Sequence, residues 1–204
     1  RYCLLSRGLG DVYKRQPYAY LANTRLPGLD HPVEYLPVDI LAVMKQVNNQ
    51  PSPACPPKAR YSGIDAARWA ALYQVPFAVN GGLFQAMRGG QFDGALLARA
   101  AVAAQQAGVF ESVHPALFAA VWAGNAELWN QEGRQDFLRE LKLDIDLWQL
   151  ADSPQAREQL AANDALAIQR GVFGVPTFFC DDEMYFGNDR LDFVRAALQK
   201  TKEA

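Results

Sequence analysis

The stretch Gly171–Cys180 constrains the fold more than any other part of the chain. Its first two glycines bracket a Val-Phe pair, so the backbone can bend tightly there without a Cβ penalty. Val175-Pro176 follows, and then the apolar, β-prone run Thr177–Cys180. Because proline cannot donate to a sheet ladder, Pro176 fits the first residue of a strand or a cis bond in a tight turn. A cis bond would turn the main-chain N–H and C=O of Val175 away from the sheet, where they could pair with an extended, peptide-like ligand.

The residues after this corner predict a β-hairpin and a closing helix. Asp181–Glu183 is a polar turn, Met184–Phe186 predicts a short second strand, and Gly187-Asn188 predicts a turn. Asp189 stands where a helix N-cap belongs, ahead of apolar residues at helical spacing. A strand, a reversal, a second strand and a capped helix after a Val-Pro corner are how a thioredoxin-like domain ends.

Two motifs are more specific than the fold. Gly-Val-Phe-Gly-Val-Pro-Thr-Phe at 171–178 and Phe-Gly-Asn-Asp-Arg-Leu at 186–191 resemble the glutathione-dependent 2-hydroxychromene-2-carboxylate isomerases. Those enzymes are close relatives of kappa-class glutathione transferases, in the DsbA-like branch of the thioredoxin superfamily. The resemblance runs in order from Pro17 to Leu198 and is strongest at the two ends of that span. A generic cis-proline corner in another thioredoxin-fold protein is the alternative.

The resemblance and the hydrophobic pattern together predict an α/β, DsbA-like thioredoxin fold with a large all-helical insertion. The 204 residues suit one domain with an insertion, and half of them are hydrophobic, which is enough for a sizeable core. No strand pattern interrupts residues 60–165. We expect the thioredoxin-like domain in residues 17–58 and 160–204 and the helical domain in residues 59–159, closing over the active site with an apolar pocket for a second substrate.

Residues 1–16 differ from the rest of the chain. They carry four basic residues against one acidic residue. Residues 6–11 show no strand alternation, and the segment lacks the apolar core and cleavage site of a signal peptide. The segment resembles translated adapter or assembly-junction sequence. We therefore expect residues 1–16 to be foreign, with residues 11–15 standing in for a first strand.

The position before Pro17 decides what the resemblance implies for catalysis. Pro17 opens a predicted helix, because proline is favoured at the first helical position. The resembling family has a strand ending in Ser-Pro-Tyr before this helix, and Gln16 occupies the position of its catalytic serine. That serine donates a hydrogen bond to the glutathione sulfur, where the helix N-terminus also favours a thiolate. Gln16 has an amide and no hydroxyl, so we expect this chain to be impaired and its natural parent to carry serine.

The remaining glutathione contacts also follow from the resemblance. The Val175 backbone, beside Pro176, would pair with the cysteinyl part of glutathione. Asp189 would accept from the γ-glutamyl ammonium, with Asn188 assisting. A helix cap is the alternative role for Asp189.

Asn49 and Lys58 lie in a proline-rich connection, residues 48–58. In the resembling family an Asn-x-Pro-Pro loop ending in Lys lines the glutathione site. The Asn49 amide could bond the peptide, and the Lys58 ammonium could pair with its glycyl carboxylate. A stiff loop and a solvated lysine are the alternatives.

Charge and cysteine usage exclude several classes of protein. A net charge of −2 gives no indication of nucleic acid or an anionic membrane as a partner, and no apolar run approaches the ~20 residues of a membrane span. Cys3, Cys55 and Cys180 are isolated, without a C-x-x-C, so neither dithiol chemistry nor a disulfide framework is indicated. Cys180 fits a small, buried strand residue. The pattern suits a reducing cytoplasm.

Other polar residues have structural explanations. His31 precedes a proline in a predicted turn, and His114 precedes Pro115 at a predicted helix start. Neither has ligand partners nearby, so we expect no metal site and favour surface or capping roles over acid–base catalysis. Asp65 and Arg68, at i and i+3, predict an ion pair within a helix. The acidic residues around positions 144–152 form no catalytic pair.

The function predicted from these residues is a glutathione-dependent isomerase of 2-hydroxychromene-2-carboxylate-type aromatic acids, in aromatic catabolism. A kappa-like glutathione transferase, with the same site and another pocket, is one alternative. A non-catalytic glutathione-binding protein, suggested by Gln16, is a second. A dithiol oxidoreductase is disfavoured, because no cysteine lies near Pro17. The partners expected are glutathione and a small aromatic acid, and the resemblance leaves a homodimer open.

Overall fold

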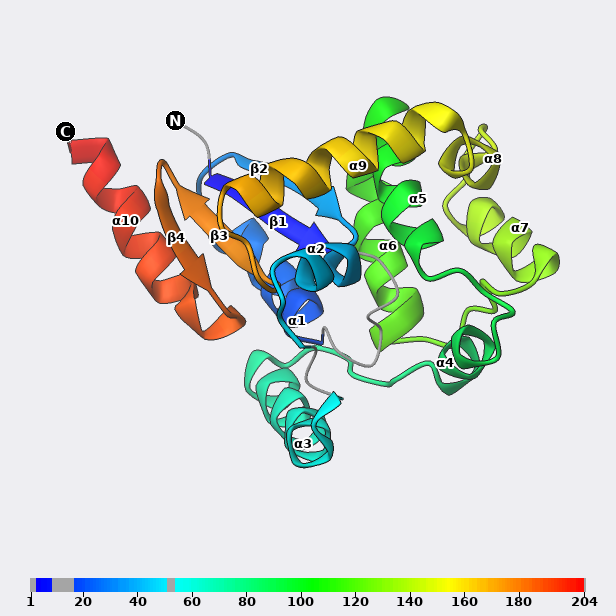
Figure 1. Cartoon of the computed structure of the whole chain (residues 1–204), viewed down its shortest axis with the longest axis horizontal. Coiled ribbons are helices and arrows are strands. Elements are labelled where there is room, and N and C mark those ends of the chain that lie inside the picture. The colour runs from blue at the N-terminus through cyan, green and yellow to red at the C-terminus, as the bar shows by residue number, and fades with distance from the viewer. Residues whose placement is uncertain (1–2, 9–16, 51–53, 204) are drawn as a thin grey trace.

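The computed structural model of the chain describes residues 3–8, 17–50 and 54–203, and side chains within 17–50 and 54–200 (Figure 1). Four strands form one mixed sheet in the order β2-β1-β3-β4. They are β1 Cys3–Gly8, β2 Val33–Val38, β3 Thr177–Cys180 and β4 Glu183–Phe186. Strand β1 runs parallel to β2 and antiparallel to β3, and β3 and β4 form an antiparallel hairpin. The hairpin predicted after the Val-Pro corner is confirmed.

The first strand lies earlier in the chain than expected. The structure places it at Cys3–Gly8, paired with Val33–Val38 on one side and with Thr177–Cys180 on the other. Residues 11–15, the predicted stand-in, are outside the described residues. The segment Cys3-Leu4-Leu5 is apolar, which suits a central strand of a sheet whose two faces are covered by helices. The foreign origin of residues 1–16 stays a prediction.

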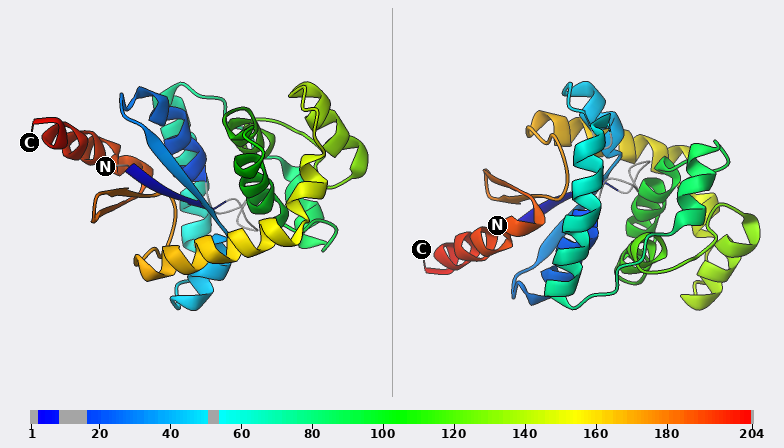
Figure 2. Two further views of the ribbon diagram at one scale, coloured as in Figure 1. Left: turned by 90° about the horizontal axis from the view of Figure 1, so that it is seen from above. Right: turned by 90° about the horizontal axis from the view of Figure 1, so that it is seen from below.

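Helices cover both faces of the sheet (Figure 2). Helix α1 Pro17–Arg25, the short 3-10 helix η1 Leu26–Gly28 and α10 Leu191–Glu203 pack with Phe178 and Cys180 on one face. Helix α9 Pro154–Gln169 lies on the other face, with α2 Ile40–Gln46 beside it. The helix predicted from Pro17 is confirmed.

The long stretch between α2 and α9 is helical, as the absence of a strand pattern predicted. It contains α3 Pro56–Tyr73, α4 Gly81–Arg88, α5 Ala95–Gln106, α6 Phe110–Trp122, α7 Gln131–Glu140 and α8 Leu147–Ala151. One hydrophobic cluster runs from Leu21 and Val38 into Leu97, Phe118 and Trp148, so these helices share the core of the sheet. The domain boundaries remain a prediction. None of the described helices combines the length and hydropathy that crossing a bilayer requires.

Helix α3 buries few of its side chains for its length: two of eighteen residues, against four of sixteen in α9. Of its eighteen residues, only Ala66 and Ala70 are buried. Its outer side exposes Tyr61, Ile64 and Leu72, each by more than half. The helix packs alongside α1 (Figure 2), and its inner side faces the cleft described below.

A buried arginine fastens α5 to α8. The Arg99 guanidinium donates to the Ala151 carbonyl at 3.0 Å, to Asp93 at 2.8 Å and to Asp152 at 2.9 Å. Arg157 also donates to Asp152, at 2.8 Å. Asp152 therefore has a structural role, since it accepts from two guanidinium groups.

The prediction for His114 was wrong. Helix α6 begins at Phe110, so His114 lies inside the helix instead of at its start, and it is buried. Its ring stacks on Phe110 at 4.6 Å between centroids and meets the rings of Tyr35 and Phe118 at 5.0 Å. The aromatic packing accounts for the burial. Cys180, in contrast, is a buried residue of β3, as expected.

Candidate functional site

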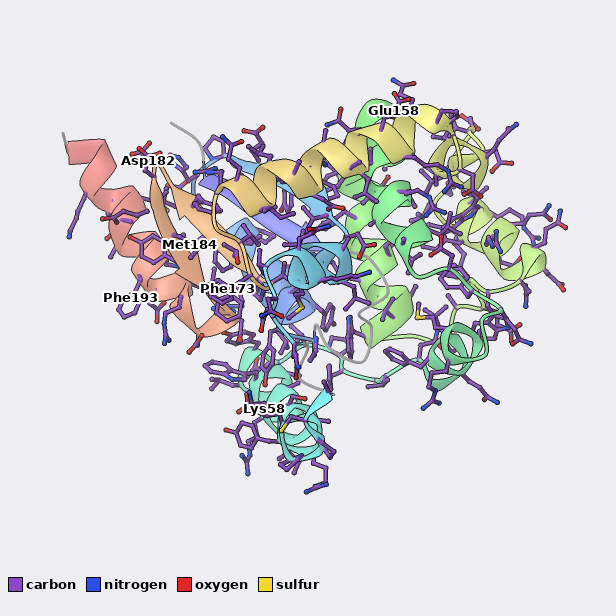
Figure 3. The ribbon with its side chains drawn as sticks, viewed as in Figure 1. Lys58, Glu158, Phe173, Asp182, Met184 and Phe193 are labelled. Carbon is purple, nitrogen blue, oxygen red and sulfur yellow. The ribbon has the colours of Figure 1, made fainter. Side chains whose placement is uncertain are left out.

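A cleft of about 810 Å³ lies beside the Val-Pro corner. Its walls come from the start of α1, the end of α2, the inner side of α3, the corner itself and the turn between β4 and α10. Six residues selected from the sequence line it: Asn49, Lys58, Val175, Pro176, Asn188 and Asp189. Figure 3 shows Lys58 on α3 and Phe173 ahead of the corner. Gln16, the seventh, lies outside the described residues. Positions up to 140 residues apart in the chain therefore meet at one cleft.

The corner presents main-chain groups to the cleft. The Val175-Pro176 peptide bond is cis, as predicted. The Pro176 carbonyl accepts from the Gly187 N–H at 3.0 Å, and Thr177 Oγ1 donates to the Gly174 carbonyl at 2.7 Å. Within residues 17–50 and 54–200, neither main-chain group of Val175 pairs with another backbone group. A ligand lying along the corner could use both.

The turn after β4 presents an ion pair. Asp189 lies in the 3-10 helix η3 Asn188–Arg190, and its carboxylate pairs with the Arg190 guanidinium. Gly187 precedes it at φ 110°, and a Cβ there would come within 2.4 Å of Asp189 Oδ1. The predicted N-cap role for Asp189 was wrong, because α10 begins only at Leu191 and the carboxylate folds back over Gly187. The carboxylate and the guanidinium are both about half exposed, so a ligand can reach them.

Asn188 is buried between this turn and α3. Its Nδ2 donates to the Tyr73 hydroxyl, and that hydroxyl approaches the Asn188 carbonyl, each at 3.5 Å. The Arg25 guanidinium lies 5.2 Å from the centre of the Tyr73 ring. Tyr73, which sequence reasoning did not single out for the site, therefore joins α3 to the turn.

Asn49 is held against the corner. Its Nδ2 donates to the Phe173 carbonyl at 2.7 Å, and its own N–H donates to the Met44 carbonyl at 2.8 Å. These two bonds hold the segment that follows α2 against Phe173, which precedes Val175 by two residues. Lys58, in the first turn of α3, is exposed and lines the same cleft.

A tyrosine–carboxylate cluster in the cleft was missed at the sequence level. The Tyr18 hydroxyl donates to Asp65 Oδ2 at 2.8 Å, and the Tyr61 hydroxyl donates to Asp65 Oδ1 at 3.3 Å. Burial, and then the hydrogen bond to Asp65 and its charge, raise the pKa of Tyr18 well above its usual range. The hydroxyl therefore remains a hydrogen-bond donor to Asp65 well into the alkaline range. The predicted ion pair of Asp65 with Arg68 was wrong, since the two tyrosines take the carboxylate.

Helical spacing could have identified this side of α3. Lys58, Asp65 and Trp69 are separated by seven and four residues, which places them on one side of a helix. All three line the cleft. Trp69 is only partly buried against the core, which leaves part of its ring available to the cleft.

Apolar groups complete the walls. Met44 and Val47 come from the end of α2, and Phe173 and Phe186 pack together with ring centroids 4.7 Å apart. The Phe186 ring lies so close to Gly174 that a Cβ there would come within 2.8 Å of it. The cleft thus combines main-chain groups and charges for a peptide with apolar surface for an aromatic compound.

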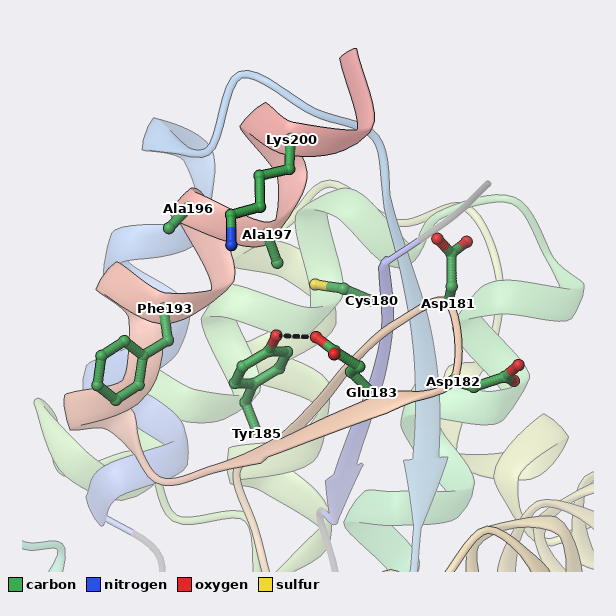
Figure 4. A pocket seen from close by; sticks show the side chains of 9 residues that line it. All are labelled: Cys180, Asp181, Asp182, Glu183, Tyr185, Phe193, Ala196, Ala197 and Lys200. Carbon is green, nitrogen blue, oxygen red and sulfur yellow. Dashed lines mark hydrogen bonds between the residues drawn. The ribbon is translucent and has the colours of Figure 1, made fainter. Parts of the chain in front are cut away.

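A second groove, of about 590 Å³, lies between β4 and α10 (Figure 4). Tyr185 donates to Glu183 there at 2.5 Å, and this hydrogen bond raises the pKa of Tyr185 to about 12. Cys180 and Lys200 also line it. None of the six described site residues does, so the larger cleft is the candidate site. Within the described residues, no three His, Cys, Asp or Glu side chains are grouped to hold a metal ion.

Comparison with known proteins agrees with this architecture. The family model described as a DSBA-like thioredoxin domain matches residues 15–199. The 2-hydroxychromene-2-carboxylate isomerase of Sphingobium xenophagum is 32% identical over 189 residues, which cover 89% of this chain and 92% of that protein. The enzyme of the same name from Pseudomonas sp. strain C18 is 33% identical over 193 residues, covering 89% and 85%. A solved 2-hydroxychromene-2-carboxylate isomerase structure has a TM-score of 0.79 at 24% identity, covering 98% of this chain and 96% of that one.

Proposed function

Since this chain belongs to the DsbA-like thioredoxin domains and, among them, to the 2-hydroxychromene-2-carboxylate isomerases, we propose that it is a glutathione-dependent isomerase of 2-hydroxychromene-2-carboxylate-type aromatic acids. The observation that carries the glutathione part of the proposal is the meeting of Val175, Asn49, Lys58 and Asp189 at one cleft. Val175, Lys58 and Asp189 offer groups suited to the cysteinyl, glycyl and γ-glutamyl parts of the tripeptide, and Asn49 holds the corner through the Phe173 carbonyl.

The residues present fit glutathione. The main-chain N–H and C=O of Val175 suit the cysteinyl unit, because an extended peptide pairs with both groups of an extended residue. Lys58 can neutralise the glycyl carboxylate. Asp189 can accept from the γ-glutamyl ammonium. The volume of about 810 Å³ leaves room for a second, aromatic compound beside the tripeptide.

When bound, glutathione would supply a thiolate whose addition to a carbon–carbon double bond of an unsaturated acid leaves a single bond that can rotate, and whose elimination restores the double bond. The protein itself would position the glutathione sulfur and shield the aromatic substrate from water. The start of α1 at Pro17 borders the cleft through Tyr18, and the N–H groups of a helix start favour a nearby thiolate. Trp69, Met44 and Phe186 offer apolar surface to an aromatic ring.

Calorimetry with glutathione, on this chain and on Gln16→Ser, tests the binding part. We expect both forms to bind, because the groups named above do not involve residue 16. Absence of binding by both forms would contradict the glutathione site. Binding of glutathione with its sulfur blocked by a methyl group serves as a control, since the charged ends of the tripeptide are then unchanged.

Turnover separates the isomerase from its alternatives. With glutathione saturating, we expect Gln16→Ser to isomerise 2-hydroxychromene-2-carboxylate faster than the unchanged chain. Equal turnover by both forms would contradict the impairment attributed to Gln16. Conjugation of a chlorinated dinitrobenzene without isomerisation would favour the transferase, and binding without either reaction in both forms would favour a non-catalytic protein.

A further inference from the structure

Two neighbouring residues of α9 hold the connection between β2 and α2. Asn163 donates through Nδ2 to the Pro37 carbonyl at 2.8 Å, in a buried position. Asp164 Oδ1 accepts from the Asp39 N–H, also at 2.8 Å. The Asp39 carboxylate in turn caps α2, because it accepts from two N–H groups of the first turn. The start of α2 therefore lies between two carboxyl groups, and both residues are half-buried.

Few other charges act on this carboxyl pair. On the elements that pack against α9, the charged side chains are Lys45 near the other end of α2, Glu34 on β2 and Arg99 on α5, while α8 has none. Lys45 and Glu34 are exposed, and Arg99 is held by the two carboxylates described above. The charged residues of α9 itself lie toward its two ends. Among the described residues, Asp39 is the charged group that acts on Asp164.

The charge of the pair changes near neutral pH. Burial raises the pKa of Asp164 to about 7, the hydrogen bond from the Asp39 N–H opposes the rise, and the Asp39 charge adds to it. With one proton, the pair carries a single negative charge at the start of α2. Without it, two carboxylates share a half-buried contact between α2 and α9. Loss of the proton therefore favours states in which α2 has moved away and water reaches Asp164.

Movement of α2 would alter the cleft, because this helix forms one of its walls. Ile40, Met44 and Val47 line the cleft. Asn49, just after the helix, donates to the Phe173 carbonyl at 2.7 Å and so supports the Val-Pro corner. The helix has only seven residues, so a shift at its start is carried to its end.

We propose that Asp39 and Asp164 form a pH-sensitive latch, which holds α2 against α9 while Asp164 carries a proton and loosens as that proton is lost. The latch requires no ligand, whereas its effect on glutathione binding rests on the proposed function. Between about pH 4 and pH 7, opening exposes Asp164 to water and releases its proton, so open states become more populated as the pH rises. Above that window Asp164 is ionised in both states, and their ratio is constant.

Hydrogen exchange followed by mass spectrometry on residues 40–49 tests the latch without any ligand. Asp164→Asn keeps an oxygen for the Asp39 N–H and stays neutral. We expect the exchange rate of the unchanged chain, divided by that of Asp164→Asn at the same pH, to rise about threefold or more from pH 5 to pH 7.5. The direct effect of pH on exchange cancels in this ratio. An equal ratio at the two pH values would overturn the latch.

Two further variants separate the latch from a general effect of charge. Glu158→Gln is the matched control, because Glu158 lies on the same helix and is exposed (Figure 3). The same ratio, taken with Glu158→Gln in place of Asp164→Asn, should be equal at the two pH values. Asp39→Asn keeps a side chain that can cap α2 and removes the charge beside Asp164, so its own exchange should rise less between pH 5 and pH 7.5 than that of the unchanged chain.

Glutathione calorimetry at pH 5 and pH 7.5 tests the connection to the cleft. The affinity of the unchanged chain, relative to Asp164→Asn at the same pH, should fall by about threefold as the pH rises. The titration of glutathione itself cancels in this comparison. Equal relative affinities at the two pH values would overturn the effect on the cleft. Absence of glutathione binding by both chains would overturn the proposed function alone, since the exchange measurement decides the latch by itself.

Discussion

The Tyr18 hydroxyl donates to Asp65 Oδ2 at 2.8 Å and so joins the start of α1 to the middle of α3. Only Ala66 and Ala70 of α3 are buried, so this bond is a substantial part of what holds the helix at the cleft. Tyr18→Phe removes the bond and keeps the ring. We expect α3 to exchange its amide hydrogens faster, with a loss of about 1 kcal/mol in the free energy of its local opening.

Hydrogen exchange followed by mass spectrometry would measure this effect on residues 56–73. Tyr61→Phe is the matched control, since Tyr61 donates to the same carboxylate from within α3 and joins no second element. Exchange in α3 that is equally fast in the two variants would show that the contact between the helices does not depend on Tyr18. Glutathione affinity should fall in Tyr18→Phe, because Lys58 is carried by α3.

Replacement of Gly187 by alanine tests the turn that presents Asp189. The φ of 110° is unfavourable for any residue with a Cβ, and the new methyl group would come within 2.4 Å of Asp189 Oδ1. We expect a loss of about 1–3 kcal/mol in the free energy of unfolding, and displacement of the carboxylate. Urea unfolding and glutathione calorimetry would measure the two effects. Gly28→Ala is the control, because its Cβ would meet nothing within 4 Å, and a loss there as large as at Gly187 would contradict the account.

The parts of the fold that were predictable are those determined within a few residues. Pro176 cannot donate to a ladder, which marks the corner, and Asp39 caps α2 by accepting from the N–H groups of Leu41 and Ala42. The contact between Tyr18 and Asp65 could not be predicted from local sequence patterns. The two residues are 47 positions apart, and their contact depends on how α3 packs on α1.

Local rules also misled in identifiable ways. Proline favours the first turn of a helix, so Pro115 suggested a start at His114, yet α6 begins at Phe110. The helix tolerates this proline because the carbonyl that loses its partner belongs to Glu111, an exposed residue that water can reach. The six described site residues were selected mainly by resemblance to a family, and their meeting at one cleft required the folded chain.

Arg99→Met should destabilise the helical part of the molecule. The substitution keeps much of the buried stem and removes donors from the Ala151 carbonyl, Asp93 and Asp152. Because both carboxylates are more than half exposed, water can replace part of what they lose. We expect a loss of about 2 kcal/mol in the free energy of unfolding, measured in urea. Arg139→Met, which disrupts an exposed pair with Asp136, should change it by less than about 0.5 kcal/mol. Equal losses in the two variants would contradict a special role for the buried guanidinium.

Asp164 should make stability depend on pH. Its carboxyl lies on α9, accepts from the Asp39 N–H at 2.8 Å, and has its pKa raised to about 7 by burial, with Asp39 adding repulsion and the hydrogen bond opposing the rise. Between about pH 4 and pH 7 the folded chain therefore keeps a proton that the unfolded chain has lost. Stability contributed by this group falls as pH rises through that window, and is constant above it.

Asp164→Asn removes the titration and keeps an oxygen that can accept from Asp39. We expect the free energy of unfolding of the unchanged chain, relative to this variant, to fall between pH 4 and pH 7 by on the order of 1 kcal/mol, allowing for partial exposure. Urea unfolding of both chains at several pH values measures the difference, in which the contributions of the other acidic groups cancel. Parallel curves would show that the Asp164 carboxyl titrates alike in the folded and unfolded chains, and its burial against α2 would then carry no electrostatic cost.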